Sequence, residues 1–587
     1  MAEAHRLPEE QELMPRSNAS EKANSLMKYR TLRSWLASFI LGFLSAAAIF
    51  GILAGVLVVV IPPRTPDLIS AQTLCYALFF QDAATKQVIS LVTATTPNGI
   101  SFVSDNAGSM AICDSDLLGR RVWFTLSSPG YAYPPDFMGL HGLSVDLTPG
   151  NSSTVLLQRT IKAERIYRIT GAGLYHHATT INRQRSWHTA TPEPLVPIPI
   201  DAEEAQLNSG VVGLDSIQNA VFQGISYFFF GDTVPLTYPL GIFAVTGATV
   251  ATLDVDKGLN LTYFEDRTAG FVRPMTSIPP FDKPTWLSGL VAIPKAPQLD
   301  AMVAFYSKVA ADMHELERGL LQWNPTLGFF EPIAVLPLDD PMADPLSSNI
   351  HVRRYPDHPG TLFFCRPFPT VRLVGAGGPG SLFNKMLQNF THYEGYTALP
   401  PGCDPYTLNG TARVLSACAR QLTRDNVTGE LLYGWRAHTP PLEGDLEAQL
   451  VAAGVMRAAE SRWSLVDVET GRPVRVVSGD VQWNLERSRY VLVGEASGAP
   501  ESALGEVYYS EAEKLEGPWT RAVKIASHPG YSFYNPVHLG MFDSDAFIYF
   551  AGTYSNTFSG TQQPVPRADY NNLMYSLDLR TVAGYFL

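Results

Sequence analysis

Short apolar segments separated by turn residues recur along most of this chain, and this pattern constrains its fold more than any other feature. Between residues 74 and 164, segments such as Tyr76–Phe80 and Val122–Leu126 have strand composition, and Pro97-Asn98-Gly99 is a turn signal. The chain is 46% hydrophobic and only 17% charged, with 44 prolines and 46 glycines, which is typical of compact, turn-rich β proteins. We therefore expect residues 74–164 to form a small β-sandwich.

The remainder, residues 165–587, repeats paired strands with a longer period. These pairs recur around residues 211–232, 288–335, 349–374, 430–496 and 504–577. Radial repetition of small antiparallel sheets is the signature of a β-propeller, and about five units fit this length. The sequence thus predicts an all-β chain in which a five-bladed propeller follows the sandwich. Two segments, Gln298–Leu321 and Leu446–Glu460, predict helical excursions from the blades.

Ahead of the sandwich, the segment from Trp35 to Ile61 contains no charged side chain. At 1.5 Å per residue, such a helix crosses a bilayer core of roughly 30 Å, so residues 34–62 predict one transmembrane helix. A cleaved signal peptide is the alternative, but the run is long and lies far from Met1. Four basic residues lie close before the run, Lys22, Lys28, Arg30 and Arg33.

Only Arg64 follows this run closely. The positive-inside rule then places the N-terminal tail, residues 1–33, in the cytoplasm, where its polar composition predicts disorder. The remainder of this single-pass, type II protein is expected in the lumen or outside the cell. Five Asn-X-Ser/Thr sequons beyond the run agree with that topology. They begin at Asn151, Asn260, Asn389, Asn409 and Asn426.

All five cysteines also lie beyond the apolar run, where disulfides persist. Their spacing suggests Cys75–Cys113 and Cys403–Cys418 pairs with Cys365 left over, although spacing alone does not decide the connectivity. We find no metal-ligand spacing and no cofactor motif, so neither a metal nor a cofactor is expected. The net charge of −12 argues against a nucleic-acid partner.

Two aspartates flank a predicted hairpin in the first propeller unit. Asp215 precedes its first strand, Asp232 follows its second, and Gln223-Gly224 forms the turn. Aspartate is depleted from strands and costly to bury, so its position here needs an explanation. Glycoside hydrolysis requires a pair of carboxyl groups. Asp215 is the candidate nucleophile or general base, and Asp232 is its partner acid or a group that shifts its pKa. A capping aspartate and an Asx turn are the structural alternatives.

Three blocks resemble a family of five-bladed propeller hydrolases that contains endo-D-arabinanases and xylosidase-type enzymes. The blocks are Gly213–Ser216 with Phe230–Thr233, Gly505–Glu513 with Leu515–Trp519, and Tyr531–Pro536 with Ile548–Tyr554 and Pro566–Tyr575. Three segments of the sandwich region, Asp82–Thr85, Ser104–Gly108 and Ser128–Tyr131, resemble prealbumin-like modules found beside carbohydrate enzymes. The resemblance implies a carbohydrate substrate or ligand. The chain departs from the family in one respect. Arabinanase-type enzymes draw three acids from three inner strands, whereas the first two candidate acids here, Asp215 and Asp232, lie on one hairpin.

The remaining candidate residues lie at the ends of predicted strands or in predicted loops. Glu506, which opens a predicted strand, is the candidate proton donor, and Glu331 competes for this role. Aromatic residues stack on sugar rings, although such residues more often belong to the core. The residues expected to bind sugar are Tyr238, Trp286, Trp483, Tyr534, Asn535 and His538.

Three functions remain open on the sequence. The first is a membrane-anchored, lumenal or extracellular glycoside hydrolase that uses paired carboxylates. The second is a non-catalytic propeller that binds a glycan or a protein, which the lack of a clear acid triad favours. The third is an accessory enzyme of another class built on the same scaffold.

Overall fold

The computed structural model describes most of the chain beyond residue 74. The described residues are 75–181, 208–237, 244–250, 255, 258–266, 268–281, 283–295, 299–343, 346, 349–375, 385–409, 412–499, 501–559 and 563–586. The expected tail, the expected transmembrane segment and Tyr238 lie outside this part. Among the described residues, no helix is long and apolar enough to cross a membrane.

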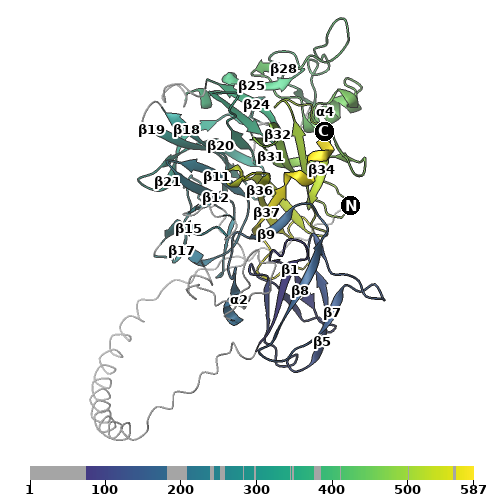
Figure 1. Ribbon diagram of the computed structural model, residues 1–587. Helices are drawn as coiled ribbons and strands as arrows, with labels where there is room; N and C mark the ends of the chain where they lie inside the picture. Colours follow the sequence, from purple (N-terminus) through teal and green to yellow (C-terminus); the bar gives the residue numbers. More distant parts are fainter. Residues whose placement is uncertain are drawn as a thin grey trace, which may run out of the picture. The chain divides into compact units, whose positions relative to one another are not determined.

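The first domain is a sandwich of two four-stranded sheets (Figure 1). One sheet has the order β4 (Ser109–Ile112), β1 (Tyr76–Asp82), β8 (Ser152–Arg159) and β6 (Tyr131–Ala132). The other has the order β3 (Ser101–Val103), β2 (Thr93–Thr95), β5 (Arg121–Ser127) and β7 (Gly142–Asp146). Along β5, buried Val122, Phe124 and Leu126 alternate with exposed residues and fill the space between the sheets.

Five sheets follow and form the blades of a propeller, each built around four antiparallel strands. Blade 1 contains β11 (Ile217–Phe222), β12 (Ile225–Phe230), β14 (Thr246–Val250) and β15 (Leu261–Tyr263). Blade 2 contains β18 (Thr285–Lys295), β19 (Leu299–Val309), β20 (Glu315–Asn324) and β21 (Phe329–Leu336). Blade 3 contains β22 (His351–Arg353), β23 (Thr361–Cys365), β24 (Pro369–Val374), β25 (Tyr393–Thr397) and β28 (Gly434–Ala437).

Blades 4 and 5 complete the set. Blade 4 contains β31 (Val476–Asn484), β32 (Arg489–Ala496), β33 (Glu506–Ala512) and β34 (Arg521–Ala526), and is extended by β29 (Leu465–Asp467) and β30 (Pro473–Val474). Blade 5 contains β35 (Ser532–His538), β36 (Phe547–Ser555), β37 (Asn571–Asp578) and β9 (Glu164–Arg168). Because β9 precedes blade 1 in the sequence, blade 5 combines the two ends of the propeller.

The first strand of each blade lies innermost, and the inner strands contact one another in a closed ring. The contacts run from β11 to β18, β22, β31, β35 and back to β11. A separate apolar cluster fills the space between each pair of neighbouring blades. The chain is therefore an all-β protein with a five-bladed propeller, as the sequence predicts.

Short elements connect or extend the blades. They are β10 (Val211–Leu214), β13 (Thr233–Pro235), β16 (Glu265–Asp266), β17 (Phe271–Val272), β26 (Tyr406–Asn409), β27 (Ala412–Leu415), α2 (His176–Ile181) and α4 (Gly444–Ala452). Short 3-10 turns occur at η2 (Asn208–Gly210), η6 (Phe390–His392), η7 (Ala458–Glu460), η8 (Gly540–Phe542), η9 (Leu579–Thr581) and η10 (Ala583–Phe586). Helix α4 and turn η7 match the excursion predicted over Leu446–Glu460.

The helix expected over Gln298–Leu321 is wrong, because this segment forms strands β19 and β20 of blade 2. Residues 301–309 of β19 are buried on both faces of the sheet. A strand buried on both faces lacks apolar–polar alternation, and its continuous apolar run cannot be distinguished from a buried helix by periodicity.

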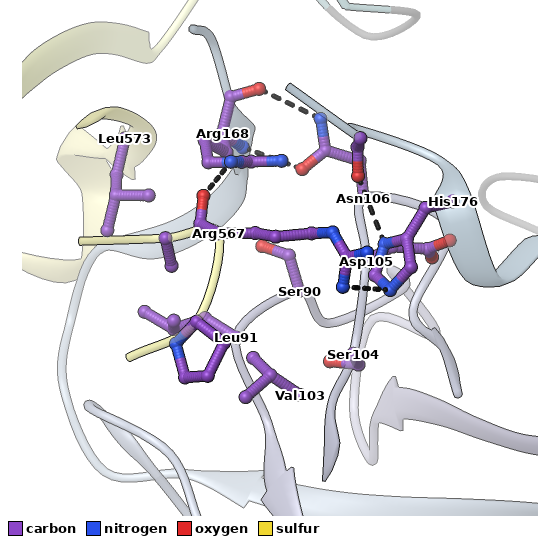
Figure 2. A pocket seen from close by; sticks show the side chains of 13 residues that line it. Ser90, Leu91, Val103, Ser104, Asp105, Asn106, Arg168, His176, Arg567 and Leu573 are labelled. Carbon is purple, nitrogen blue, oxygen red and sulfur yellow. Dashed lines mark hydrogen bonds between the residues drawn. The ribbon is translucent and has the colours of Figure 1, made fainter. Parts of the chain in front are cut away.

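The sandwich is attached to the strand that closes the propeller. The Asn106 amide donates to the Arg168 carbonyl at 2.8 Å and accepts from the Arg168 N–H at 2.9 Å, as a neighbouring strand would (Figure 2). The buried Arg165 guanidinium donates to the carbonyl oxygens of Ser90 and Pro129 in the sandwich, at 2.7 and 2.6 Å. Both arginines belong to β9, so one strand serves the ring and the junction together.

Both expected disulfides form. Cys75–Cys113 lies in the sandwich, and Cys403–Cys418 lies in the insertion of blade 3, the segment between β25 and β28. Cys365 is free and buried. Removing the second disulfide with a Cys403→Ser, Cys418→Ser double substitution should destabilise the insertion by about 3 kcal/mol, since the bond closes a loop with a sequence separation of 15. Limited proteolysis should then cut within residues 398–434 first. Unchanged protease resistance there would contradict the assignment.

Candidate functional site

Asp215 and Asp232, the two aspartates predicted from the sequence, lie side by side between two strand pairs that belong to different sheets. Strands β11 and β12 pair from Ile217 opposite Phe230, and β10 and β13 continue as a separate pair. Between these pairs, the Gly231 N–H donates to the Asp215 carbonyl at 2.8 Å, and the Asp215 N–H donates to the Asp232 carbonyl at 3.2 Å. Both aspartates therefore sit at the N-terminal end of the innermost strand of blade 1.

The Asp215 carboxyl lies over Gly231 and meets blade 5. A Cβ atom on Gly231 would fall 1.9 Å from Asp215 Oδ1, so only glycine fits at this position. The Tyr534 hydroxyl donates to Asp215 Oδ2 at 3.2 Å, and Tyr570 also hydrogen-bonds the carboxyl. Burial and the nearby Asp232 charge raise the pKa of Asp215 to about 7, against the lowering effect of the two tyrosines.

Asp232 faces blade 2. The Trp286 indole N–H donates to Asp232 Oδ1 at 2.9 Å. Burial raises the pKa of Asp232 to about 6, and the bond from Trp286 opposes this rise. The charge of Asp232 is the second cause that raises the pKa of Asp215, so the titration of Asp215 depends on the ionisation of Asp232.

A third carboxyl, which the sequence analysis missed, lies at the same end of the ring. Glu495 is 2% exposed near the end of β32, opposite Ser478 of the inner strand β31. Its Oε2 accepts from the Asn535 N–H at 3.2 Å, and the Ser478 side chain also hydrogen-bonds the carboxyl. Burial raises the pKa of Glu495 to about 8. The Asn535 amide also donates to Ser216 Oγ at 2.8 Å, which links Glu495 to the residue beside Asp215.

Backbone strain is concentrated around these carboxyls. Four non-glycine residues there have left-handed φ values, namely Ser216 (45°), Asn535 (51°), Tyr570 (57°) and Phe558 (66°). Such conformations cost roughly 1 kcal/mol or more each and persist where the surrounding contacts enforce them. Strain gathered at one location points to a functional site rather than to a folding requirement.

The other predicted residues lie elsewhere. Glu506 is on β33, the third strand of blade 4, where it pairs with Lys524 at 2.9 Å and accepts from Ser527 at 2.8 Å. Glu331 is exposed on β21, the outermost strand of blade 2, and accepts from Asn324. Trp483 packs edge-on against Tyr490, with ring centroids 5.0 Å apart, toward the other end of β31.

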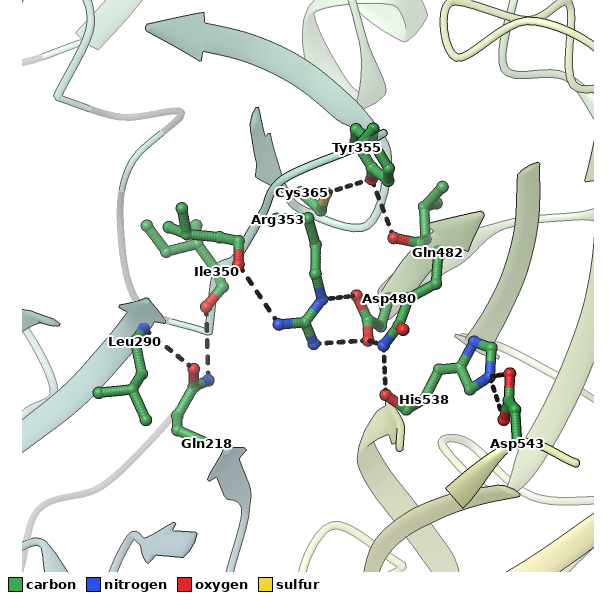
Figure 3. Close-up of polar contacts among 12 residues, drawn as sticks. Gln218, Leu290, Ile350, Arg353, Tyr355, Cys365, Asp480, Gln482, His538 and Asp543 are labelled. Atoms are coloured by element: carbon green, nitrogen blue, oxygen red, sulfur yellow. Dashed lines mark hydrogen bonds and ion pairs between the residues drawn. The ribbon is translucent and has the colours of Figure 1, made fainter. Parts of the chain in front are cut away.

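A polar network joins the inner strands of blades 3, 4 and 5 (Figure 3). Arg353 of β22 donates two hydrogen bonds to Asp480 of β31, at 2.8 and 2.6 Å. Gln482 donates to Asp480 at 2.9 Å and to the carbonyl of His538, and the buried His538 ring faces Asp543 at 3.0 Å. The sequence analysis expects His538 to bind sugar. In the structure, His538 belongs to the polar network that joins blades 3, 4 and 5.

A cavity of about 210 Å³ opens at the C-terminal ends of the inner strands. It is lined by Val221, Ala292, Arg354, Gln482 and Met541, among others, from all five blades. In the described part of the chain, no cluster of three or more His, Cys, Asp or Glu residues could hold a metal ion. The three carboxyls therefore lie near the N-terminal ends of the inner strands, and this cavity, which polar and apolar residues line, lies near the C-terminal ends.

Comparison with known proteins finds only distant likenesses. No protein-family model and no curated protein sequence matches the chain. Among solved structures, a GH43 enzyme from Xanthomonas citri bound to xylose is 13% identical, with 62% of this chain and 86% of that chain covered and a TM-score of 0.29. An exo-β-1,3-galactanase from Phanerochaete chrysosporium is 10% identical, with 62% and 63% covered and a TM-score of 0.31. A β-xylosidase, RS223, is 10% identical, with 63% and 93% covered and a TM-score of 0.32.

The raised pKa of Asp215 predicts a pH-dependent effect on stability. A carboxyl whose folded-state pKa is about 7, against 3.8 ordinarily, costs no stability below pH 4. The cost grows as the pH rises, because the unfolded chain loses its proton first, and becomes constant above pH 7. Asp215→Asn removes this cost, so its stability relative to wild type should increase by about 2 kcal/mol between pH 5 and pH 7.5 in denaturant titrations.

The matched control is Glu486→Gln, which changes an exposed carboxylate in the turn between β31 and β32. Its stability difference from wild type should stay constant over the same pH range. Parallel pH curves for Asp215→Asn and wild type would show that Asp215 ionises normally.

Proposed function

We propose that the carboxyl-lined end of the propeller hydrolyses glycosidic bonds. The observation that carries this proposal is the set of three carboxyls, Asp215, Asp232 and Glu495, with pKa values of about 7, 6 and 8 at one end of the ring. Glycoside hydrolysis needs one carboxyl that keeps its proton and one that is ionised at the same pH. Separated pKa values supply both forms near neutral pH.

Each carboxyl has a distinct role in this proposal. Asp215, held by Tyr534, acts as the general base on water or as the nucleophile. Asp232 raises the pKa of Asp215 by charge repulsion. Glu495, which keeps its proton up to about pH 8, protonates the leaving oxygen as the glycosidic C–O bond breaks.

Glu495 is a better candidate for the proton donor than Glu506. Glu506 lies two strands away from the inner strand of blade 4, and it forms an ion pair with the Lys524 ammonium at 2.9 Å. Glu495, by contrast, pairs directly with the inner strand β31 and is linked through Asn535 to Ser216, the residue beside Asp215. The assay of variants described below separates these two residues.

A non-catalytic propeller that binds a glycan or a protein is the second candidate. The cavity of about 210 Å³ at the opposite end of the channel favours it, since a ligand held there would not reach Asp215. Binding without the release of new reducing ends is the result that would select this function.

The activity prediction uses a panel of glycans that includes xylotriose and β-1,3-galactotriose, assayed for new reducing ends. Asp215→Asn and Glu495→Gln should each lower the rate at least 100-fold, because each removes a proton-transfer group. Glu506→Gln should lower it less than tenfold, provided that thermal melting shows an intact fold. A larger loss for Glu506→Gln than for Glu495→Gln would move the donor to Glu506, and full activity of Asp215→Asn would exclude the mechanism.

We also propose that residues 34–62 anchor the protein in a membrane, with the sandwich and propeller in the lumen or outside the cell. All five sequon asparagines, residues 151, 260, 389, 409 and 426, are exposed, and two disulfides bind the chain beyond the run. In sealed vesicles, protease should spare the propeller, and removal of N-glycans should increase its gel mobility. An unglycosylated, protease-sensitive propeller would contradict this topology.

A further inference from the structure

An exposed aromatic side chain lies beside the carboxyl end of the channel. Phe558, in the loop between β36 and β37, is 62% exposed. Its ring meets the ring of Tyr534 edge to face, with centroids 5.4 Å apart. Tyr534 in turn donates its hydroxyl hydrogen to Asp215. Only one tyrosine therefore separates Phe558 from the carboxyl that the proposed function places at the reacting bond.

Hydrogen bonds fix the backbone on both sides of Phe558, although its side chain faces solvent. The Ser532 hydroxyl donates to the Thr557 carbonyl at 2.9 Å, and the Asn556 N–H donates to Asp569 Oδ1 at 2.6 Å. The Ser559 N–H donates to the Asn556 carbonyl at 3.0 Å, closing a turn around Phe558. Rigid aromatic groups bind ligands at low entropic cost.

The identity of this residue is not explained by folding. Phe558 adopts a φ of 66°, a conformation that glycine and asparagine accept more easily than phenylalanine. Exposure of the ring also forgoes its burial energy. This large apolar side chain is exposed, adopts a left-handed φ and touches the residue that orients Asp215, so it is placed to contact a ligand.

The opposite side of the carboxyl pair is also aromatic. Trp286 of blade 2 donates to Asp232, Tyr534 of blade 5 donates to Asp215, and Phe558 packs against Tyr534. Aromatic faces pack against the C–H faces of sugar rings, which carry no charge. The chemistry of the two sides fits a neutral oligosaccharide.

We propose that Phe558 is the stacking platform of a sugar subsite next to the bond that is cleaved, and that it takes the apolar face of a neutral sugar ring. This inference rests on the proposed function for the position of the reacting bond. Phe558 takes part in no proton transfer. It acts through binding, and an aromatic replacement should preserve its role.

The test measures the binding and cleavage of neutral trisaccharides separately. Calorimetry and the reducing-end assay are run on wild type, Phe558→Ala, Phe558→Trp and Phe137→Ala, with xylotriose, β-1,3-galactotriose and cellotriose as probes. Phe137 is a matched control, because it is 95% exposed but lies in the sandwich. Phe558→Ala should bind the trisaccharide about tenfold more weakly, Phe558→Trp should restore binding, and Phe137→Ala should behave as wild type.

The outcomes separate this inference from the proposed function. If wild type binds a trisaccharide without cleaving it and Phe558→Ala loses affinity, the platform stands and hydrolysis is refuted. If wild type cleaves a trisaccharide and Phe558→Ala binds and cleaves it equally well, the platform is refuted and hydrolysis stands. A wild type that binds none of the three trisaccharides, or a Phe558→Trp variant as weak as Phe558→Ala, also overturns the platform.

Discussion

The antiparallel pairing of β9 with β37 is the interaction on which the rest of the structure depends. This pairing, which sets Arg168 opposite Leu573, supplies the fourth strand of blade 5 from the chain segment that precedes blade 1. It therefore fixes blade 1 against blade 5. The same strand is tied to the sandwich through Arg165 and Asn106, so the first domain supports the closure of the second.

The candidate site lies across the seam that this pairing closes. Asp215 belongs to blade 1 and Tyr534 to blade 5, and further bonds across the seam join Ser216 to Thr553 and Asn572 to Leu214. Opening of the ring at this point would separate Asp215 from its tyrosine. The hydrogen bonds that hold blade 1 against blade 5 therefore also hold Asp215 in place.

Charge pairing distinguishes the candidate carboxyls from most other buried acids of the propeller. Asp480 pairs with Arg353, Glu511 with Arg487 and Glu506 with Lys524. Asp215 and Glu495 receive only uncharged donors, and their pKa values rise. A raised pKa alone does not identify the site, because Asp105 at the domain junction and Glu447 in α4 also have pKa values of about 7. Position at the inner end of a blade is the second criterion.

Local sequence signals predicted the strands, the turns, both disulfides and the flanking pair Asp215 and Asp232, because each depends on residues close in the chain. The helix expected over Gln298–Leu321 failed because burial on both faces removes the alternation of a strand. Glu495 was missed for a different reason. No local sequence signal distinguishes Glu495 from the other residues of its strand. It reaches the site because the pairing of β31 with β32 sets it opposite Ser478.

The dependence of kcat/KM on pH tests the central claim most directly, since it reports the ionisation of the free enzyme. The rate should fall below about pH 7 as Asp215 gains its proton and above about pH 8 as Glu495 loses its proton. Glu495→Gln should abolish the fall on the alkaline side. A profile that is flat from pH 5 to 9, or an alkaline fall that persists in Glu495→Gln, would contradict the account.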